Sequence, residues 1–107
     1  MQAFKDTFDV VADRRDNPQE GSYTCYLFEK GLDKILKKCG EECTEMVIAA
    51  KNQDKEELVN EINDLLYHTI VLMVECGVSV EDVEAVMAER AKKIGNLKQF
   101  HVSDHNT

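Results

Sequence analysis

The chain has 107 residues, which is enough for one domain. Hydrophobic residues make up 43% and charged residues 32%, a composition that excludes a disordered tail. The formal net charge of −8 argues against nucleic acid as the main partner, because phosphate backbones select basic surfaces. No stretch approaches the ~20 apolar residues of a membrane span. We therefore expect neither a nucleic acid nor a membrane among its partners.

The first apolar pattern lies at the N-terminus, before the loop that contains Pro18. Phe4, Phe8 and Val11 recur at the spacing of one helix face. This segment carries acidic residues throughout and lacks an apolar run of signal-peptide length. No CxxC pair of a zinc site occurs either, so we expect reduced, packed thiols. Together these features predict a cytoplasmic protein.

Three further helices follow from apolar spacing and capping residues. The second pattern runs from about residue 24 to 52, and we interpret it as one long helix that tolerates Gly31 and Gly40. Asp54 then starts a third helix that stops at Gly77, and Ser79 starts a fourth. No segment alternates like a half-exposed strand. The sequence predicts a single all-α domain over residues 1–97 and a flexible tail over 98–107.

The third predicted helix carries a stretch that is apolar on every face. Between Leu65 and Val74 only His68 and Thr69 are polar. A helix buried on all sides is hard to arrange in a chain of this size, so a second copy should cover one face. We expect a homodimer in which three side chains of this helix meet the partner, namely Tyr67, Val71 and Val74.

Two pairs of acidic residues lie on the second and third predicted helices. Glu42 and Glu45, like Glu61 and Asp64, are about 60° apart on a helical wheel. The connection between the helices is short, so they pack antiparallel, and both pairs lie roughly 10–12 Å from the turn. Four facing carboxylates cannot all stay ionised unless a cation binds or one pKa rises steeply, and hard oxygen ligands suit Mg²⁺ or Mn²⁺. A solvated acidic surface would explain the neighbouring Glu41 and Glu42. It would not explain two acidic pairs that lie at the same distance from the turn on two adjoining helices.

The acids form a recognisable motif, EExxE followed after 15 residues by ExxD. This motif is similar to the signature of the MazG-like, all-α NTP pyrophosphohydrolase superfamily. More narrowly, GSYTCYLFEKGLDKILKKCGEECTEMVIAAKN followed by ELVNEINDLLYH resembles the phosphoribosyl-ATP pyrophosphohydrolase family, over about residues 20–93. The Gly21-Ser22-Tyr23-Thr24 lead-in and the Lys37-Lys38-x-Gly40 run point to this member of the superfamily.

The resemblance implies a four-helix MazG-like architecture, completed by homodimerisation. It also implies hydrolysis of phosphoribosyl-ATP to phosphoribosyl-AMP and pyrophosphate, the second step of L-histidine biosynthesis. Carried over, Mg²⁺ (or Mn²⁺ as a substitute) binds Glu42, Glu45, Glu61 and Asp64. Glu41 is then either a neighbour of these ligands or the general base. On the helical wheel it points away from the apolar face, which argues against both roles.

Basic residues flank the acids on both sides. Lys34, Lys37 and Lys38 lie one to two turns before them, where we expect contacts to substrate phosphates. The lead-in adds Ser22, Tyr23 and Thr24 to the expected substrate-binding residues by resemblance. A second basic run at residues 90–98 suits either phosphate binding or the negative end of a helix dipole. We expect His68 to be a hydrogen-bonded core residue rather than a neighbour of the metal.

Two alternatives remain open from the sequence. A MazG-like housecleaning enzyme that hydrolyses surplus or aberrant NTPs, including dUTP, would share the acid motif. A non-catalytic helical dimerisation module would share the apolar segment, but would not need Glu61 and Asp64 at that height. Pyrophosphate release from a panel of triphosphates separates the three.

Overall fold

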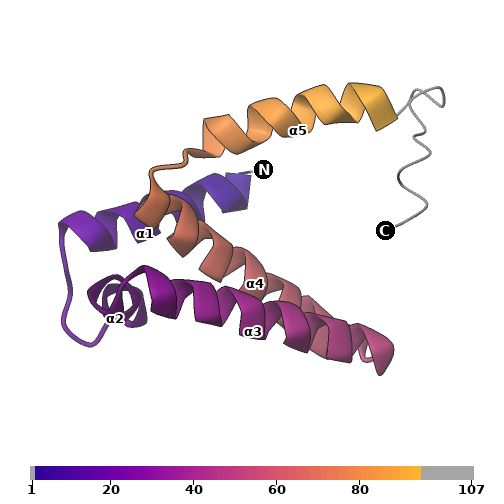
Figure 1. Cartoon of the computed structure of the whole chain (residues 1–107), viewed down its shortest axis with the longest axis horizontal. Coiled ribbons are helices and arrows are strands. Elements are labelled where there is room, and N and C mark those ends of the chain that lie inside the picture. The colour runs from indigo at the N-terminus through magenta and orange to yellow at the C-terminus, as the bar shows by residue number, and fades with distance from the viewer. Residues whose placement is uncertain (1, 95–107) are drawn as a thin grey trace.

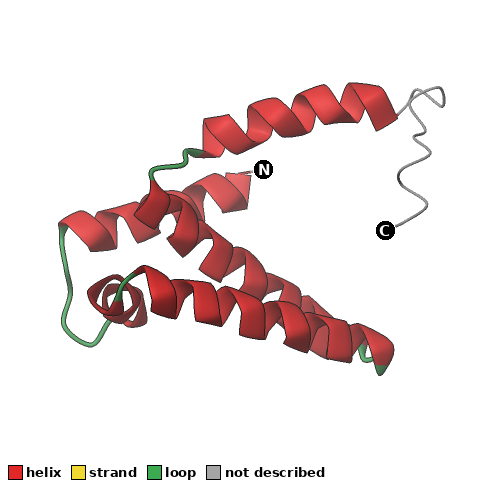
Figure 2. Cartoon of the chain, in the orientation of Figure 1, coloured by secondary structure: helices red, strands yellow, loops and turns green. Residues whose placement is uncertain are grey.

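The computed structural model describes residues 2–94, and all its regular elements are helices (Figures 1 and 2). The all-α class is therefore confirmed for this range. The predicted tail at 98–107 and the domain boundary at residue 97 lie outside it. The five helices are α1 (Gln2–Asp16), α2 (Tyr23–Lys30), α3 (Leu32–Lys51), α4 (Lys55–Cys76) and α5 (Val80–Ile94).

The helices α3 and α4 form a long antiparallel hairpin, as their short connection predicts. In Figure 1, α1 and α2 pack at the end of this hairpin that lies opposite the α3–α4 turn. The core lies at that end, and Val11, Leu27, Ile35 and Val71 are almost completely buried there. Helix α5 diverges from the hairpin, and Val80 is its only buried residue. None of the helices in residues 2–94 thus covers the turn end of the hairpin.

The second predicted helix is in fact two helices, so the prediction of four helices is corrected to five. The backbone of Gly31 has φ 92° and ψ −173°, a conformation that favours glycine over every other residue. Ser22 begins α2 by accepting a hydrogen bond from the backbone N–H of Cys25 at 3.2 Å. Apolar spacing continues through the break, which is why the sequence pattern concealed it. The break turns α2 across the hairpin, where it contacts both α3 and α4.

We expect Gly31→Ala to destabilise the protein by about 1–3 kcal/mol, because alanine is strained at this φ. Gly40→Ala is the matched control within α3. It should stabilise the protein by about 0.5–1 kcal/mol, since glycine is a poor helix former. An added Cβ meets no atom within 4 Å at either position, so crowding does not enter the comparison. Urea unfolding of both variants measures the difference, and equal effects would contradict this account of the break.

The predicted boundaries of the later helices are confirmed. The side chain of Asp54 accepts a hydrogen bond from the N–H of Glu57 at 3.1 Å. Ser79 and Asp82 form a reciprocal capping pair with both distances at 3.0 Å. These two bonds lower the pKa of Asp82. Gly77 ends α4 in the left-handed conformation, with φ 73°.

The expected contact between Val71 and a partner chain is wrong. Val71 is fully buried within its own chain, because α1 packs over this part of α4. Arg15 of α1 secures the packing by donating a hydrogen bond to the carbonyl oxygen of Val74 at 2.7 Å. Within residues 2–94, no helix has the length and apolar character needed to cross a bilayer.

Candidate metal centre

Three of the four carboxylates that were predicted to face one another do so. Glu42 and Glu45 of α3 and Glu61 of α4 each place one oxygen within 4.8 Å of the others. The antiparallel hairpin brings them to the same height, as their distances from the turn predicted. Asp64 differs, because it is exposed and its carboxylate lies outside this group. We call Glu42, Glu45 and Glu61 the acid cluster.

Two members of the acid cluster, Glu42 and Glu61, are buried, whereas Glu45 is exposed. Glu42 is 6% exposed and Glu61 8% exposed, and the Oε2 atom of each is buried without a hydrogen-bond partner among the described residues. The ammonium of Lys38 lies 3.6 Å from Oε1 of Glu42, on the other oxygen. Buried carboxylate oxygens without partners are costly, and a hard divalent cation satisfies them. The donor set therefore fits Mg²⁺ or Mn²⁺.

Glu57 is an acidic neighbour of the cluster that was not identified in the sequence as a site residue. It lies one helical turn before Glu61 on the same face of α4. The side chain of Glu57 is the largest cause that raises the pKa of Glu61 to about 8, because a neighbouring carboxylate favours the protonated form, and burial and the carboxylates of Glu45 and Glu42 add to it. The i, i+4 spacing of Glu57 and Glu61 is the sequence signal that places the two side chains on one helix face.

The raised pKa of Glu61 predicts how the stability of the metal-free protein depends on pH. The folded state binds this proton more tightly than the unfolded chain, whose carboxyl has the usual pKa of 4.5. The stabilisation of the folded state by this bound proton is therefore complete below about pH 4.5, and it is lost as the pH rises through about 8. Glu61→Gln cannot ionise and should remove this dependence. Melting temperatures in EDTA across that range test it, and parallel curves for the two proteins would contradict it.

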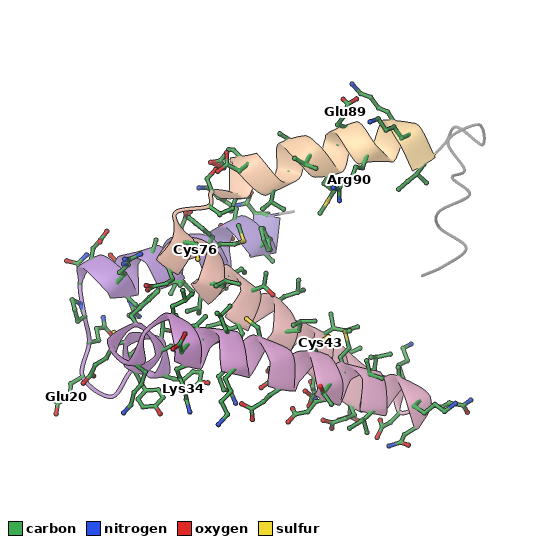
Figure 3. The ribbon with its side chains drawn as sticks, in the orientation of Figure 1. Glu20, Lys34, Cys43, Cys76, Glu89 and Arg90 are labelled. Atoms are coloured by element: carbon green, nitrogen blue, oxygen red, sulfur yellow. The ribbon has the colours of Figure 1, made fainter. Side chains whose placement is uncertain are left out.

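The predicted phosphate-binding lysines lie along α3 beside the cluster. Lys37 and Glu41 line a depression of about 400 Å³ together with Glu45. Glu41 is exposed, yet it borders the same depression as a cluster residue, which keeps it within reach of the site. Lys38 contacts the cluster directly through Glu42. Lys34 lies further back at the start of α3, next to α2 (Figure 3).

The lead-in residues hold α2 against α4 through side-chain hydrogen bonds. The hydroxyl of Thr24 bonds that of Tyr67, and the hydroxyl of Tyr23 lies 3.0 Å from Nε2 of His68. His68 is 5% exposed and hydrogen-bonded, so its expected place in the core is confirmed. Ser22 uses its side chain as the cap of α2. Of the three predicted lead-in residues, Tyr23 is the most exposed.

Comparison with known proteins agrees with this geometry. The family model described as phosphoribosyl-ATP pyrophosphohydrolase matches residues 2–91, which extends the resemblance to α1. A phosphoribosyl-ATP pyrophosphatase of Clostridium botulinum is 58% identical over 91 residues, covering 85% of this chain and 83% of that protein. A protein of the same name from Streptococcus thermophilus is 65% identical over 85 residues, covering 79% and 82%. One from Clostridium novyi is 50% identical over 98 residues, covering 92% and 89%. The chain therefore belongs to the phosphoribosyl-ATP pyrophosphohydrolase family.

Proposed function

We propose that this chain hydrolyses phosphoribosyl-ATP to phosphoribosyl-AMP and pyrophosphate, the second step of L-histidine biosynthesis, with Mg²⁺ bound at the acid cluster. The relatives that it resembles over most of their length are named for this activity. One structural observation carries the proposal. Three carboxylates from two helices converge, and two of their buried oxygens have no protein partner in the described chain. Neither a dimerisation module nor an acidic surface needs that arrangement.

Glu42, Glu45 and Glu61 would hold the metal ion, and Asp64 is the proposed fourth ligand. When bound, Mg²⁺ supplies positive charge against the phosphate oxygens and lowers the pKa of water that it binds. Glu61 must lose its proton to become a ligand, because its pKa in the metal-free protein is raised to about 8. Metal binding is thus coupled to the release of one proton.

The remaining roles belong to side chains around the cluster. Water attacks the α-phosphorus, the bond to the β-phosphate oxygen breaks, and pyrophosphate leaves. Glu41 is the proposed acceptor of the proton of this water, since it borders the same depression as Glu45. Lys37 and Lys38 are proposed to neutralise phosphate oxygens, with Lys34 further along α3. A protein with a net charge of −8 repels a polyphosphate unless cationic side chains neutralise the phosphate oxygens.

The test is pyrophosphate release by the purified chain from phosphoribosyl-ATP, with Mg²⁺ and with excess EDTA. We expect turnover with Mg²⁺ and none with EDTA, and Mn²⁺ should substitute. Turnover of dUTP and other (d)NTPs without phosphoribosyl-ATP would favour the housecleaning alternative. Failure to release pyrophosphate from any triphosphate would overturn the proposal.

A homodimer is the proposed assembly, with α5 rather than Val71 at its interface. Val86, Met87 and Ile94 are 49%, 63% and 81% exposed on α5. They line an apolar groove of about 550 Å³ together with Arg90, on the side of α5 that faces the hairpin in Figure 3. An exposed apolar groove of this kind marks an association site, and a second copy offers matching apolar residues.

Met87→Glu is expected to weaken the dimer at least tenfold, because the interface would bury an unpaired carboxylate. Glu89→Ala is the control, since Glu89 points away from the groove in Figure 3. Light scattering of dilution series measures the dissociation of the dimer in both variants. Circular dichroism confirms that the helices persist. A wild-type mass that stays at 12.2 kDa would end the dimer proposal.

The cytoplasm is the proposed compartment, because all four cysteines are free. The net charge of −8 continues to argue against a nucleic-acid partner, which stays a prediction.

A further inference from the structure

A hollow of about 580 Å³ lies between α2 and the loop that leads into it from α1, and we call it the α2 hollow. Tyr23, Tyr26 and Glu29 line it from α2, and Pro18 and Glu20 line it from the loop, where Figure 3 labels Glu20. The two tyrosines are 45% and 39% exposed. In the described part of the chain, no lysine and no member of the acid cluster lines this hollow. The reaction at the metal centre therefore leaves it without a role.

Hydrogen bonds within the loop fix the rim of the α2 hollow. The thiol of Cys25 donates to the carbonyl oxygen of Arg14 and accepts from the backbone N–H of Gln19, both at 3.4 Å. The backbone N–H of Ser22 donates to the carbonyl oxygen of Gln19 at 3.2 Å. These bonds tie the loop to the end of α1 and to the start of α2. The hollow is thus formed before a ligand binds, as small-molecule sites usually are.

The aromatic lining of the α2 hollow is a pair of nearly parallel rings. The centroids of Tyr23 and Tyr26 are 6.0 Å apart, and the ring planes differ by 23°. No further ring can enter between them, because a planar ring needs about 3.5 Å of contact distance on each side. A ligand ring must therefore lie against an open face of the pair. The ring of Tyr26 already attracts a cation, since Nζ of Lys30 lies 5.7 Å from its centroid.

The charge of the lining selects the chemistry of the ligand. Among the described residues, the charged groups that line the hollow are both acidic, Glu20 and Glu29. Such a lining repels phosphate, whereas two aromatic faces and two carboxylates attract a planar cation. The adenine of ATP is neutral. Alkylation at N1 turns it into an amidine that is protonated at neutral pH, and phosphoribosyl-ATP carries its second ribose at N1.

The α2 hollow also lies at a suitable distance from the acid cluster. The hydroxyl of Tyr23 lies 3.0 Å from Nε2 of His68 on α4. His68 follows Glu61 by seven residues, which places it roughly 10 Å further along that helix. The ribose of a nucleotide spans a distance of this order between its base and its α-phosphate. A nucleotide with its phosphates at the metal centre can therefore reach the hollow with its base.

We propose that the α2 hollow binds the adenine of phosphoribosyl-ATP and selects it through the positive charge that alkylation at N1 gives the ring. The cationic ring packs on the tyrosine pair, and Glu20 and Glu29 balance its charge. This inference rests on the proposed function and deepens it, because it assigns the base of the substrate to Tyr26, Glu20 and Glu29 in addition to Tyr23. It adds a preference over ATP that does not depend on contacts to phosphate.

The first experiment measures binding without metal or turnover. Adenosine and 1-methyladenosine, whose base is cationic and which has no phosphate, are titrated into the wild-type protein in EDTA and followed by NMR. We expect 1-methyladenosine to bind about tenfold more tightly, the value of one partly desolvated cation–π contact. It should also shift the ring signals of Tyr23 and Tyr26. Equal affinities of the two nucleosides, or shifts confined to other residues, would overturn the proposal.

Variants in the same titration separate the ring of Tyr26 from its hydroxyl. Tyr26→Leu should lower the affinity for 1-methyladenosine about tenfold, whereas Tyr26→Phe keeps the ring and should stay within about twofold of the wild type. Glu29→Gln should lower this affinity by removing a negative charge. Glu56→Gln, at the turn end of the hairpin, is its control and should not. Circular dichroism confirms the fold of each variant. Equal losses in Tyr26→Leu and Tyr26→Phe would refute the cation–π contact.

The second experiment compares kcat/KM for ATP and 1-methyl-ATP at saturating Mg²⁺. These substrates differ in the charge of the base but have the same phosphates, so the contribution of the additional ribose phosphate is excluded. We expect 1-methyl-ATP to be preferred about tenfold through KM, and Tyr26→Leu to remove this preference. Turnover of phosphoribosyl-ATP together with equal nucleoside affinities would refute the role of the hollow and leave the proposed function intact. No turnover would refute the proposed function, and the titration would still decide which base the hollow binds.

Discussion

Glu45→Gln is expected to lower kcat by roughly a hundred- to a thousandfold, about 3–4 kcal/mol of barrier. Glu45 supplies one of the three converging oxygens, and a neutral amide binds a divalent cation much more weakly than a carboxylate does. Above about pH 8, where Glu61 is ionised in the metal-free protein, the same substitution relieves repulsion between these two carboxylates. The melting temperature in EDTA should therefore hold or rise while activity falls. That combination separates loss of a ligand from loss of the fold.

Glu56→Gln is the matched control, since it removes the same charge from the exposed first turn of α4 and should leave kcat nearly unchanged. Calorimetric titration with Mn²⁺ measures the metal affinity of each variant directly. A Glu45→Gln enzyme that keeps more than about a tenth of the wild-type kcat (under ~1.4 kcal/mol) would remove Glu45 from the ligand set.

Asp64→Asn tests the one predicted ligand that lies outside the acid cluster. If Asp64 joins the metal when substrate binds, this variant should lose turnover as fully as Glu45→Gln does. Its affinity for Mn²⁺ without substrate should fall less, because Glu42, Glu45 and Glu61 converge without it. Full turnover in Asp64→Asn would restrict the ligand set to those three.

Phosphoribosyl-ATP is expected to be preferred over ATP by on the order of a hundredfold or more in kcat/KM. One charge-assisted contact to phosphate is worth roughly 1.5–3 kcal/mol, and the additional ribose phosphate allows two such contacts. Lys38→Ala should narrow this preference without weakening Mn²⁺ binding, because a lysine is not a ligand of this metal. Lys51→Ala, at the far exposed end of α3, is the control.

The measurement compares kcat/KM for phosphoribosyl-ATP, ATP, dUTP and dCTP at saturating Mg²⁺. A plain NTP or dNTP that equals phosphoribosyl-ATP would refute the histidine-pathway assignment and favour housecleaning hydrolysis. An unchanged preference in Lys38→Ala would instead exclude Lys38 alone from substrate recognition.

The sequence by itself determined the helical class, the caps at Asp54 and Ser79, and the height at which the acids meet. These features depend on residues three or four apart, or on distance along a helix from a short turn, and helix geometry converts both directly into position. The family followed from the acid motif and the lead-in, and the match to residues 2–91 confirms it.

The tertiary structure decided what depends on neighbours distant in the chain. A glycine inside an apolar pattern is compatible with a helix or a break, and packing of α2 against α1 and α4 selected the break at Gly31. Helix α1 covers Val71 because of the angle at which α1 crosses α4. Apolar periodicity in the sequence does not specify that angle. The same holds for the separation of Asp64 from the acid cluster, and for the hydrogen bond by which His68 holds Tyr23. Local spacing fixes the direction of a side chain from its own helix axis, whereas the groups it meets depend on how the helices pack.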